Sequence, residues 1–593
     1  MQLATNLVQL FHDGVGRRGD RPYLWRRTPD GYVPTTWNEV AEQVALLARA
    51  LREAGVQAGD RVVIVAENRP EWLIADLAAL TLGAVTVPAY TTNTVRDHQF
   101  ILSHSGASAV FYSGAAVART LLPAIREVGT IRTIVAIEPP DDAADLPIFS
   151  YATALERGAA ADATPFAMPA PHDLACIIYT SGTGGQPKGV MLSHANMLAN
   201  VDGSIDLLEE LGVGDDEVFL SFLPLSHSYE HTAGQFVPMG IGAQVYYAEG
   251  VDTLSQNLGE ARPTILTCVP RLYEVMRQRI LAGVNRAGGT KAWLFKKAVE
   301  IGTKRYEKQP LAVHERLLDL LLDRLVRTKV NERFGGRLKA MVSGGAPLNY
   351  DVGVFFAALG LPIFQGYGQT EASPVISANR PKRHKLKSVG LPLRGVEIRI
   401  AEDGEILVRG NLVMKGYWQD DAATASTLID GWLHTGDVGS IDDEGFLSIT
   451  GRKKEMIVNS GGDNISPQRV EGVLSLEPEI GQVLVYGDRR PHLVALVVPD
   501  ADFLKAFATS QGVEADLTAI ADNPELRKAV GAAITRANAE LSVIEKVRRF
   551  EIMGEPFTIE NGTMTPTLKL RRPIIVERHQ TLFEQLYEPA RAA

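Results

Sequence analysis

The sequence is poor in cysteine, in long apolar runs and in positive charge. Its two cysteines, Cys176 and Cys268, are too few for a disulfide framework or a zinc-ligand cluster, which indicates a reducing compartment. No apolar run approaches the ~20 residues that a membrane-spanning helix needs. Lys and Arg number 60 against 70 Asp and Glu, a net charge of −10. This balance argues against a nucleic-acid partner, because binding phosphates requires a basic surface.

The length and composition indicate a globular protein with more than one domain. A chain of 593 residues is too long for one compact core, and 45% hydrophobic with 22% charged residues is ordinary for such proteins. The N-terminal stretch MQLATNLVQLFHDGVGRR is amphipathic and lacks the basic start and cleavage site of a signal peptide. We therefore expect a cytoplasmic protein.

Helix and strand patterns alternate early in the chain. Thr36 and Glu39 form a capping-box pattern before a helix that we expect to stop at Gly55. DRVVIVAEN is a continuous apolar strand of the kind buried in a parallel sheet, and EWLIADLAALTLG and AVTVPAY add a second helix and strand. This alternation predicts an α/β layered domain.

A glycine-rich stretch, YTSGTGGQPKGV at residues 179–190, follows the predicted strand LACIIYT and precedes a helix start with Ser193 as its N-cap. Glycines let backbone N–H groups approach an anion, hydroxyls add donors and lysine adds charge, so the loop can cradle phosphates. The candidate residues are Thr180, Ser181, Gly182, Thr183, Gly184 and Lys188. An ordinary surface turn is the alternative. The stretch does not match the P-loop pattern GxxxxGK[ST], because Pro187 precedes the lysine and Gly189 follows it.

Two further glycine-rich turns lie downstream. MVSGGAPL predicts a strand followed by a turn at Gly344, Gly345, Ala346 and Pro347. QGYGQTE follows the apolar LPIF and contains Gln365, Gly366, Tyr367, Gly368, Thr370 and Glu371. Glycines beside Tyr367 would let a flat purine lie on its ring. Thr370 offers a hydroxyl, and Glu371 offers the hard oxygen ligand that Mg²⁺ prefers. A structural turn is the alternative here as well.

Two charged residues follow in WLHTGD and GRKKE. Asp437 can accept hydrogen bonds from ribose hydroxyls, and Arg452 can donate to ribose or phosphate. Taken singly, each could equally be a solvated loop charge.

The five patterns TSGT, GGAP, GYGQTE, TGD and GRKKE resemble, in their order, those of the AMP-forming adenylate enzymes: acyl-CoA synthetases, peptide-synthetase adenylation domains and luciferases. Gly184 departs from the usual TSGTTG loop and removes one hydroxyl. The resemblance implies an α/β protein with a large layered N-terminal domain of mixed sheets and helices, residues 1–452. It also implies a small mobile α/β C-terminal domain, residues 453–593, that carries the catalytic lysine.

Residues 284–335 and the stretches on either side of them resemble the long-chain fatty acyl-CoA synthetases in particular. This resemblance implies that a fatty acid and ATP form acyl-AMP and pyrophosphate, and that coenzyme A then displaces AMP. The implied substrates and cofactors are the fatty acid, ATP, coenzyme A and Mg²⁺.

The resemblance also implies roles for single residues. Tyr367 would stack adenine, Thr370 would contact the α-phosphate, and Glu371 with Thr183 would bind Mg²⁺. His227 would lie beside the acyl carboxylate, and His231 would lie near the gate of the acyl tunnel. Lys454 would be the hinge, Gly461 and Gly462 would pass the pantetheine arm, and Lys569 would be catalytic. His227 and His231 are four residues apart, but no suitably spaced carboxylate or cysteine makes them a metal site.

Residues 284–335 combine KAWLFKKAVEIGTKRYEK with the leucine-rich LAVHERLLDLLLDRLVRTKV. Two helices packed on the core are one interpretation. The other is a membrane-facing patch through which a lipid substrate enters, which would place the protein peripherally at the inner face of the membrane. Residues 501–542 resemble an insertion in the C-terminal domain, and their sequence indicates no function.

Three other functions remain open from sequence. The protein could be a fatty acyl-AMP ligase that serves a carrier protein, a CoA ligase for medium-chain or aromatic acids, or a non-catalytic acyl- or nucleotide-binding module. The sequence predicts neither the chain-length preference nor the oligomeric state.

Overall fold

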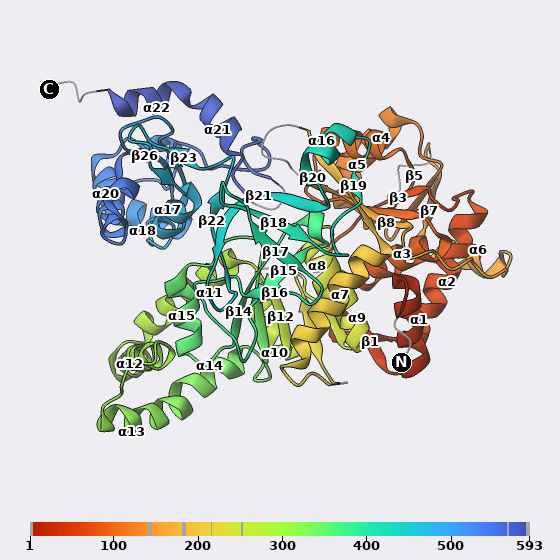
Figure 1. The fold of residues 1–593 in the computed structure, drawn as a ribbon, viewed down its shortest axis with the longest axis horizontal. Coiled ribbons are helices and arrows are strands. Elements are labelled where there is room, and N and C mark those ends of the chain that lie inside the picture. The colour runs from red at the N-terminus through yellow and green to blue at the C-terminus, as the bar shows by residue number, and fades with distance from the viewer. Residues whose placement is uncertain are drawn as a thin grey trace.

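The computed structural model describes residues 4–139, 145–180, 186–214, 216–250, 253–565 and 569–588 (Figure 1). The N-terminal layers lie at the right of the view and the blue C-terminal part at the upper left. The sheets mix parallel and antiparallel pairs with helices between them, which confirms the predicted α/β class.

The first large sheet has eight strands among the described residues, in the order β19-β9-β8-β4-β3-β5-β6-β7. In β3, Val62 and Ile64 belong to one apolar core while Val63 and Val65 belong to another. The strand is therefore buried on both faces, as its continuous apolar run predicted. The strands are β3 (Arg61–Val65), β4 (Val85–Pro88), β5 (Ala107–Tyr112), β6 (Thr133–Ala136), β7 (Ile148–Ser150), β8 (Leu174–Thr180), β9 (Lys188–Ser193) and β19 (Gly416–Tyr417).

Helix boundaries in this half follow the predicted caps. Thr36 and Glu39 form the capping box that starts α2, and Ser193 caps α7 by accepting the backbone N–H of Asn196. The helices here are α1 (Leu7–Arg18), α2 (Trp37–Glu53), α3 (Pro70–Leu82), α4 (Val95–Ser105), α5 (Ala115–Val128), α6 (Tyr151–Ala160) and α7 (His194–Glu209).

The second large sheet has nine strands in the described residues, in the order β16-β15-β14-β13-β12-β10-β11-β1-β2. Parallel strands β10 to β14 bring their carboxyl ends to one edge, which is where ligands bind in such sheets. The strands are β1 (Pro22–Thr28), β2 (Gly31–Thr36), β10 (Val218–Ser221), β11 (Gln244–Tyr247), β12 (Ile265–Cys268), β13 (Ala340–Ser343), β14 (Ile363–Gly368), β15 (Val375–Ala378) and β16 (Leu391–Pro392). The helices around it are α8 (Ser228–His231), η1 (Thr232–Phe236), α9 (Val237–Ile241), α10 (Leu254–Ala261), α11 (Pro270–Ala287), α15 (Tyr350–Ala358) and η3 (Thr370–Ala372).

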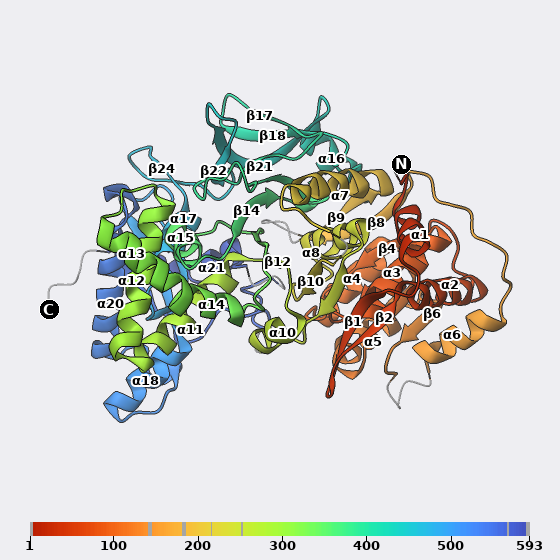
Figure 2. The same cartoon turned by 90° about the horizontal axis from the view of Figure 1, so that it is seen from below.

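A smaller antiparallel sheet lies between these layers and the C-terminal part (Figures 1 and 2). It consists of β17 (Glu397–Ile400), β18 (Glu405–Arg409), β20 (Leu428–Ile429), β21 (Trp432–Ile441) and β22 (Leu447–Arg452), and α16 (Asp421–Thr427) precedes β20. Its last strand, β22, leads directly into the C-terminal part.

The C-terminal part is built on a three-stranded sheet, β25-β26-β27, with a short β23–β24 hairpin before it. Helices of the stretch 501–542 pack on one face, and the last two helices pack on the other, so the inserted-looking stretch covers this sheet. The strands are β23 (Ile457–Val458), β24 (Asn464–Ile465), β25 (Ile480–Tyr486), β26 (Leu493–Pro499) and β27 (Val547–Ile552). The helices are α17 (Pro467–Leu474), α18 (Ala501–Gln511), α19 (Leu517–Ile520), α20 (Pro524–Ala539), η4 (Val543–Glu545), α21 (Arg572–Arg578) and α22 (Gln580–Tyr587).

Residues 289–333 form a helical projection at the lower left of Figure 1. It contains α12 (Gly289–Tyr306), α13 (Val313–Leu322), the π-turn η2 (Asp323–Arg327) and α14 (Thr328–Arg333). Phe295 is buried in the core while Trp293 is exposed, so the predicted membrane patch cannot use Phe295. Within the described residues, no helix has both the length and the hydropathy needed to cross a bilayer.

Candidate active site

A cleft with a volume of about 3040 Å³ runs between the carboxyl edge of the large sheets and the C-terminal part. The predicted site residues that line it are Thr180, Lys188, His227, Gly344, Gly345, Ala346, Pro347, Gln365, Gly366, Tyr367, Gly368, Thr370, Glu371, Asp437, Arg452, Lys454 and Lys569. His231, Gly461 and Gly462 are described but do not line it. Ser181, Gly182, Thr183 and Gly184 lie outside the described residues.

The two glycine-rich motifs near the sheet edge are sterically restricted, and the second of them lies in a strand and not in a turn. Gly345 has φ +83°, in the left-handed region that favours glycine. A Cβ on Gly368 would lie 2.1 Å from the Pro374 carbonyl oxygen, so a side chain cannot fit. Tyr367 and its flanking glycines belong to strand β14, which pairs with β15, and the helical turn η3 begins at Thr370. The backbone around Tyr367 is therefore held by strand pairing and by close contact with Pro374.

Tyr367, Asp437 and Arg452 form one hydrogen-bonded group. The Tyr367 hydroxyl donates to Asp437 Oδ2 at 2.7 Å, and Arg452 Nε donates to Asp437 Oδ1 at 2.9 Å. The Asp437 and Arg452 backbones pair across β21 and β22, which holds the two side chains side by side. Each carboxylate oxygen keeps a second lone pair, so Asp437 can still accept a hydrogen bond from a ligand hydroxyl.

The residues after β14 are also held by partners. The Thr370 hydroxyl lies 3.0 Å from that of Ser228, and Glu371 Oε1 accepts a hydrogen bond from the Tyr417 hydroxyl at 2.9 Å. Lys188 Nζ lies 4.7 Å from the centroid of the Tyr417 ring, a cation–π distance. Tyr417 thus links the glycine-rich loop to the candidate metal ligand. Sequence reasoning missed both Ser228 and Tyr417, because neither belongs to a motif that indicates its partner.

His227 is neutral at pH 7 and presents a hydrogen-bond donor. Its Nδ1 accepts the backbone N–H of Tyr229 at 3.1 Å. Burial lowers the pKa of His227 to about 4, and the positive charge of Lys569 acts in the same direction. Because Nδ1 is the acceptor, the proton is on Nε2, from which it can be donated to a carboxylate in the cleft.

His231 and its neighbour Glu230 point into the protein core. His231 Nε2 lies 2.9 Å from Asp76 Oδ2, with both side chains buried. Glu230 accepts a hydrogen bond from Thr267 at 2.7 Å, and burial raises its pKa to about 7. No group of three or more His, Cys, Asp or Glu suited to a metal occurs in the described part of the chain.

Lys569 enters the cleft from the C-terminal part. Its backbone N–H donates to Thr565 Oγ1 at 3.1 Å, and its side chain is exposed to the cleft. Desolvation by neighbouring protein atoms lowers the pKa of Lys569, and the charge of Arg452 acts in the same direction. Lys569 is therefore near enough to Arg452 for their charges to interact, and near enough to His227 for its charge to disfavour a protonated imidazole.

The chain enters the C-terminal part through residues with different attachments. Lys453 forms ion pairs with Asp403 and Glu405, whereas the next residue, Lys454, is exposed in a turn. Gly461 and Gly462 lie on an exposed loop, with φ +85° at Gly462. The structure thus brings Lys569, but not this second loop, to the cleft.

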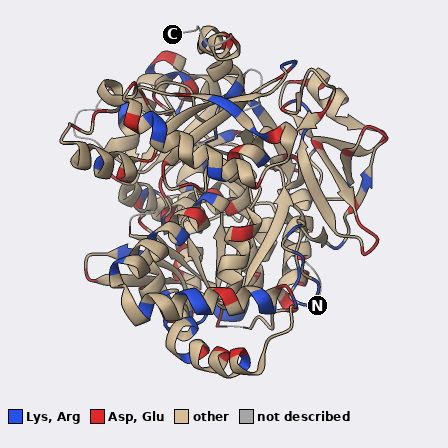
Figure 3. Ribbon diagram, turned by 90° about the vertical axis from the view of Figure 1, so that its left-hand side faces the viewer, with Lys and Arg blue, Asp and Glu red and all other residues tan. Residues whose placement is uncertain are grey.

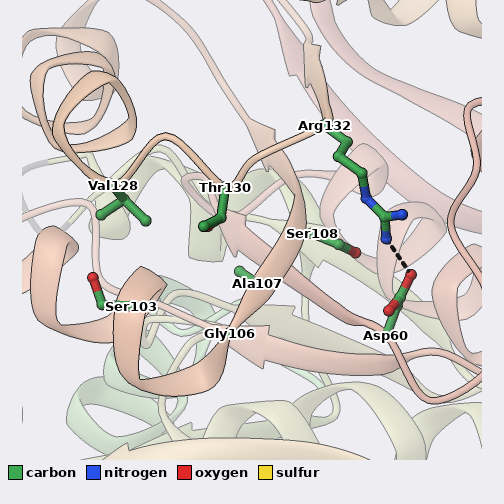
Figure 4. Close-up of a pocket in the computed structure, with 8 residues that line it drawn as sticks. All are labelled: Asp60, Ser103, Gly106, Ala107, Ser108, Val128, Thr130 and Arg132. Atoms are coloured by element: carbon green, nitrogen blue, oxygen red, sulfur yellow. Dashed lines mark hydrogen bonds and ion pairs between the residues drawn. The ribbon is translucent and has the colours of Figure 1, made fainter.

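A smaller hollow of about 390 Å³ lies on the N-terminal sheet (Figure 4). Arg132 and Asp60 point toward each other there and form an ion pair at 2.8 Å. The hollow is lined by none of the predicted site residues, so the large cleft remains the candidate site.

Comparison with known families identifies both parts of the chain. The model of the AMP-binding enzymes matches residues 11–418, and that of an AMP-binding enzyme C-terminal domain matches residues 454–591. The long-chain-fatty-acid–CoA ligase FadD15 of Mycobacterium bovis is 34% identical, over 97% of both chains. The peroxisomal long chain acyl-CoA synthetase 6 of Arabidopsis thaliana is also 34% identical, over 98% of this chain and 85% of its own.

Solved structures share the fold. The adenylation domain of a carboxylate reductase from Mycobacterium chelonae superposes with a TM-score of 0.78 at 22% identity, covering 98% of this chain and 91% of that one. The anthranilate CoA ligase AuaEII, in complex with anthranoyl-AMP, superposes with a TM-score of 0.73 at 20% identity, covering 98% and 99%. The family model that matches residues 11–418 and the relatives at 34% identity show that the chain belongs to the AMP-binding enzyme family.

Proposed function

We propose that this protein is an AMP-forming long-chain fatty acid–CoA ligase. The observation that supports this proposal best is that Lys569 and His227 meet the nucleotide-motif residues in one cleft, in a chain whose full-length relatives are named long-chain-fatty-acid–CoA ligases. A fatty carboxylate oxygen attacks the α-phosphorus of ATP, and the bond to pyrophosphate breaks. The sulfur of coenzyme A then attacks the acyl carbonyl carbon, and AMP leaves.

The fixed side of the cleft would hold the nucleotide. The Tyr367 ring would carry adenine, Asp437 would accept from the ribose, and Arg452 would keep Asp437 in place through their 2.9 Å contact. Thr370 and Lys188 would contact phosphate oxygens. These groups position the reactants and offset charge, which is most of what nucleotidyl transfer needs.

Mg²⁺ fits this site as a metal shared with the substrate. Glu371 lines the cleft and keeps one carboxylate oxygen beyond the one that Tyr417 contacts, and the described residues provide no three-residue metal cluster. Such a carboxylate suits Mg²⁺, which commonly takes one or two protein ligands together with substrate phosphates. When bound, the ion would neutralise phosphate charge.

At the acyl end, His227 would orient the fatty carboxylate. A neutral Nε2–H can donate to the carboxylate without competing with Lys569 for its negative charge. Lys569 would stabilise the charge that gathers between the entering carboxylate and the α-phosphate. The acyl-gate role of His231 stays a prediction, since His231 is paired with Asp76 away from the cleft.

We also propose that the domains divide at residues 452 and 453 and that the smaller one rotates about Lys454. Lys453 is tied to Asp403 and Glu405, which supports a pivot beginning at the next residue. Rotation would exchange the Lys569 loop for the Gly461–Gly462 loop between the two half-reactions. Because Gly461 has no side chain, it would let the thin pantetheine arm pass close to the backbone. Lys454→Pro should slow the second half-reaction by restricting this turn.

A screen of pyrophosphate release across saturated and unsaturated acids of graded length tests the proposed activity. We expect the highest release with long-chain acids such as oleate, and oleoyl-CoA as the product when coenzyme A is present. Acyl-AMP that accumulates with coenzyme A but is consumed by an acyl carrier protein would instead indicate an acyl-AMP ligase. Release that is maximal with benzoate or octanoate would contradict the long-chain assignment, and no release with any acid would contradict catalysis.

A peripheral membrane contact is the remaining part of the proposal. The helical projection supports it, since it carries both exposed apolar and basic side chains. A cytoplasmic location, expected from the scarcity of cysteine, stays a prediction.

A further inference from the structure

Helix α13 turns an apolar face outward. Val313, Leu317, Leu320 and Leu321 are 75%, 67%, 74% and 49% exposed, and their spacing places them on one side of the helix. Most surface helices turn their apolar stripe toward the core. In Figure 1 the helix lies at the lower edge of the molecule, and in Figure 2, seen from below, it faces the viewer. This outward set of four side chains is called the leucine stripe below.

The acidic residues of α13 point the other way and are paired. Glu315 lies 2.6 Å from Lys304, and Asp319 lies 3.0 Å from Arg305 of α12 and 2.7 Å from Arg327. Arg327 is buried and also donates to the Ala358 carbonyl oxygen at 2.9 Å. Ion pairs thus hold the inner face of α13 against α12 and η2, which keeps the leucine stripe facing outward.

The charge around the stripe is the opposite of that of the whole chain. Residues 286–333 contain twelve Lys and Arg and six Asp and Glu, a net charge of +6 in a chain whose net charge is −10. Arg316 and Arg324 are exposed on α13 and η2, close in sequence to the stripe. Figure 3 shows Lys and Arg interspersed with Asp and Glu along the helices at the bottom of its view, the level at which Figure 1 places α13.

We infer that the leucine stripe docks the protein on an anionic lipid bilayer. Leucines enter the boundary between head groups and acyl chains while the surrounding cations attract anionic head groups, as in interfacial helices. A second copy of this chain fits less well, because pairing two copies of this region would bring together two segments that each carry a net charge of +6. The inference names the surface for the membrane contact proposed above, and it needs no catalytic step.

Cosedimentation of the full chain with vesicles tests the inference. We expect binding to vesicles of phosphatidylcholine and phosphatidylglycerol in equal parts, weaker binding to pure phosphatidylcholine, and weaker binding again at high salt. Leu317→Glu with Leu320→Glu should reduce binding by about tenfold or more, because two apolar side chains leave the bilayer and two anions replace them. Leu317→Ser with Leu320→Ser should reduce it less. Val543→Glu, which changes a side chain that is 72% exposed in the C-terminal part, is the matched control and should bind normally.

Three results would overturn the inference. They are equal binding to neutral and anionic vesicles, unchanged binding of the Leu317→Glu/Leu320→Glu variant, and a wild-type dimer in sedimentation velocity that this variant converts to monomer. Pyrophosphate release with oleate is measured in parallel, in the absence of vesicles. A wild-type protein that releases pyrophosphate but does not bind anionic vesicles refutes docking alone, whereas a wild-type protein that binds vesicles but releases no pyrophosphate refutes the ligase assignment alone.

Discussion

The two walls of the cleft are built differently. On the N-terminal wall, Asp437, Thr370 and Glu371 are each held by a hydrogen bond to another side chain. On the C-terminal wall, Lys569 reaches the cleft while Gly461 remains on an exposed loop outside it. In the proposed mechanism, the N-terminal wall would be a fixed nucleotide site, and the contributions of the C-terminal wall would be exchanged between the half-reactions. The predictions below test this contrast.

Separate assays of the two half-reactions give the largest expected effect. Lys569→Ala should slow acyl-AMP formation by roughly 10³-fold, because the charge gathering at the α-phosphate loses its stabilising cation. Thioester formation from supplied oleoyl-AMP should be nearly unchanged. Gly461→Leu should show the opposite pattern, since its side chain would obstruct the thiol arm.

Lys528→Ala is the control for general effects on the C-terminal domain, because Lys528 is 78% exposed on α20. It should leave both half-reactions intact. Equal losses in both steps for Lys569→Ala and Gly461→Leu would mean that the C-terminal wall is as fixed as the N-terminal one.

Glu371→Gln tests the fixed wall. The amide keeps the shape of the side chain but loses its negative charge, so acyl-AMP formation should fall by roughly 10²-fold and require more Mg²⁺. The measurement is initial rate against Mg²⁺ concentration, with circular dichroism as the check on folding. A near-normal rate at limiting Mg²⁺ would remove Glu371 from the metal site.

Tyr417→Phe asks whether the fixed wall depends on its hydrogen bonds. Loss of the 2.9 Å contact with Glu371 should weaken apparent Mg²⁺ affinity by about tenfold, while the aromatic ring beside Lys188 is kept. The maximal rate at saturating Mg²⁺ should change little. A loss of maximal rate with unchanged Mg²⁺ dependence would show that Tyr417 supports the wall in some other way.

The smallest expected effect is on the pH dependence of stability, and it comes from Glu230, which is buried behind the N-terminal wall of the cleft. Its pKa is raised to about 7 in the folded protein from an ordinary value of 4.5, so its contribution to stability is complete below pH 4.5 and is lost as the pH rises through 7. Glu230→Gln should flatten this decline. Thermal melting at intervals between pH 4.5 and 8 measures it, and parallel curves for the variant and wild type would contradict the shifted pKa.

Local sequence predicted much of the fold. The Thr36–Glu39 capping box and the Ser193 cap set helix starts through contacts three residues apart, and the run in β3 predicted a strand buried on both faces. The sequence also predicted which motif residues line the cleft.

Contacts between distant segments could not be predicted. Tyr417 lies 46 residues after Glu371, and Ser228 lies 142 residues before Thr370. Only the packing of β19 against β9 and of α8 against the sheet edge brings these pairs together. Similarly, a pattern of lysines and aromatics cannot tell that Phe295 faces the core while Trp293 faces solvent.

Strand β22 ends at Arg452, which is paired with Asp437. In the turn that follows, Lys453 is paired with Asp403 and Glu405, and Lys454 is exposed. A rotation of the C-terminal domain about Lys454 would leave the Arg452–Asp437 pair in place. The contacts proposed for the ribose would then be the same in both half-reactions. The adenylate could stay bound while the C-terminal domain rotates, and AMP would leave only after the thioester has formed. In this arrangement, the order of product release would follow from the Arg452–Asp437 ion pair, because Arg452 lies two residues before the proposed hinge at Lys454.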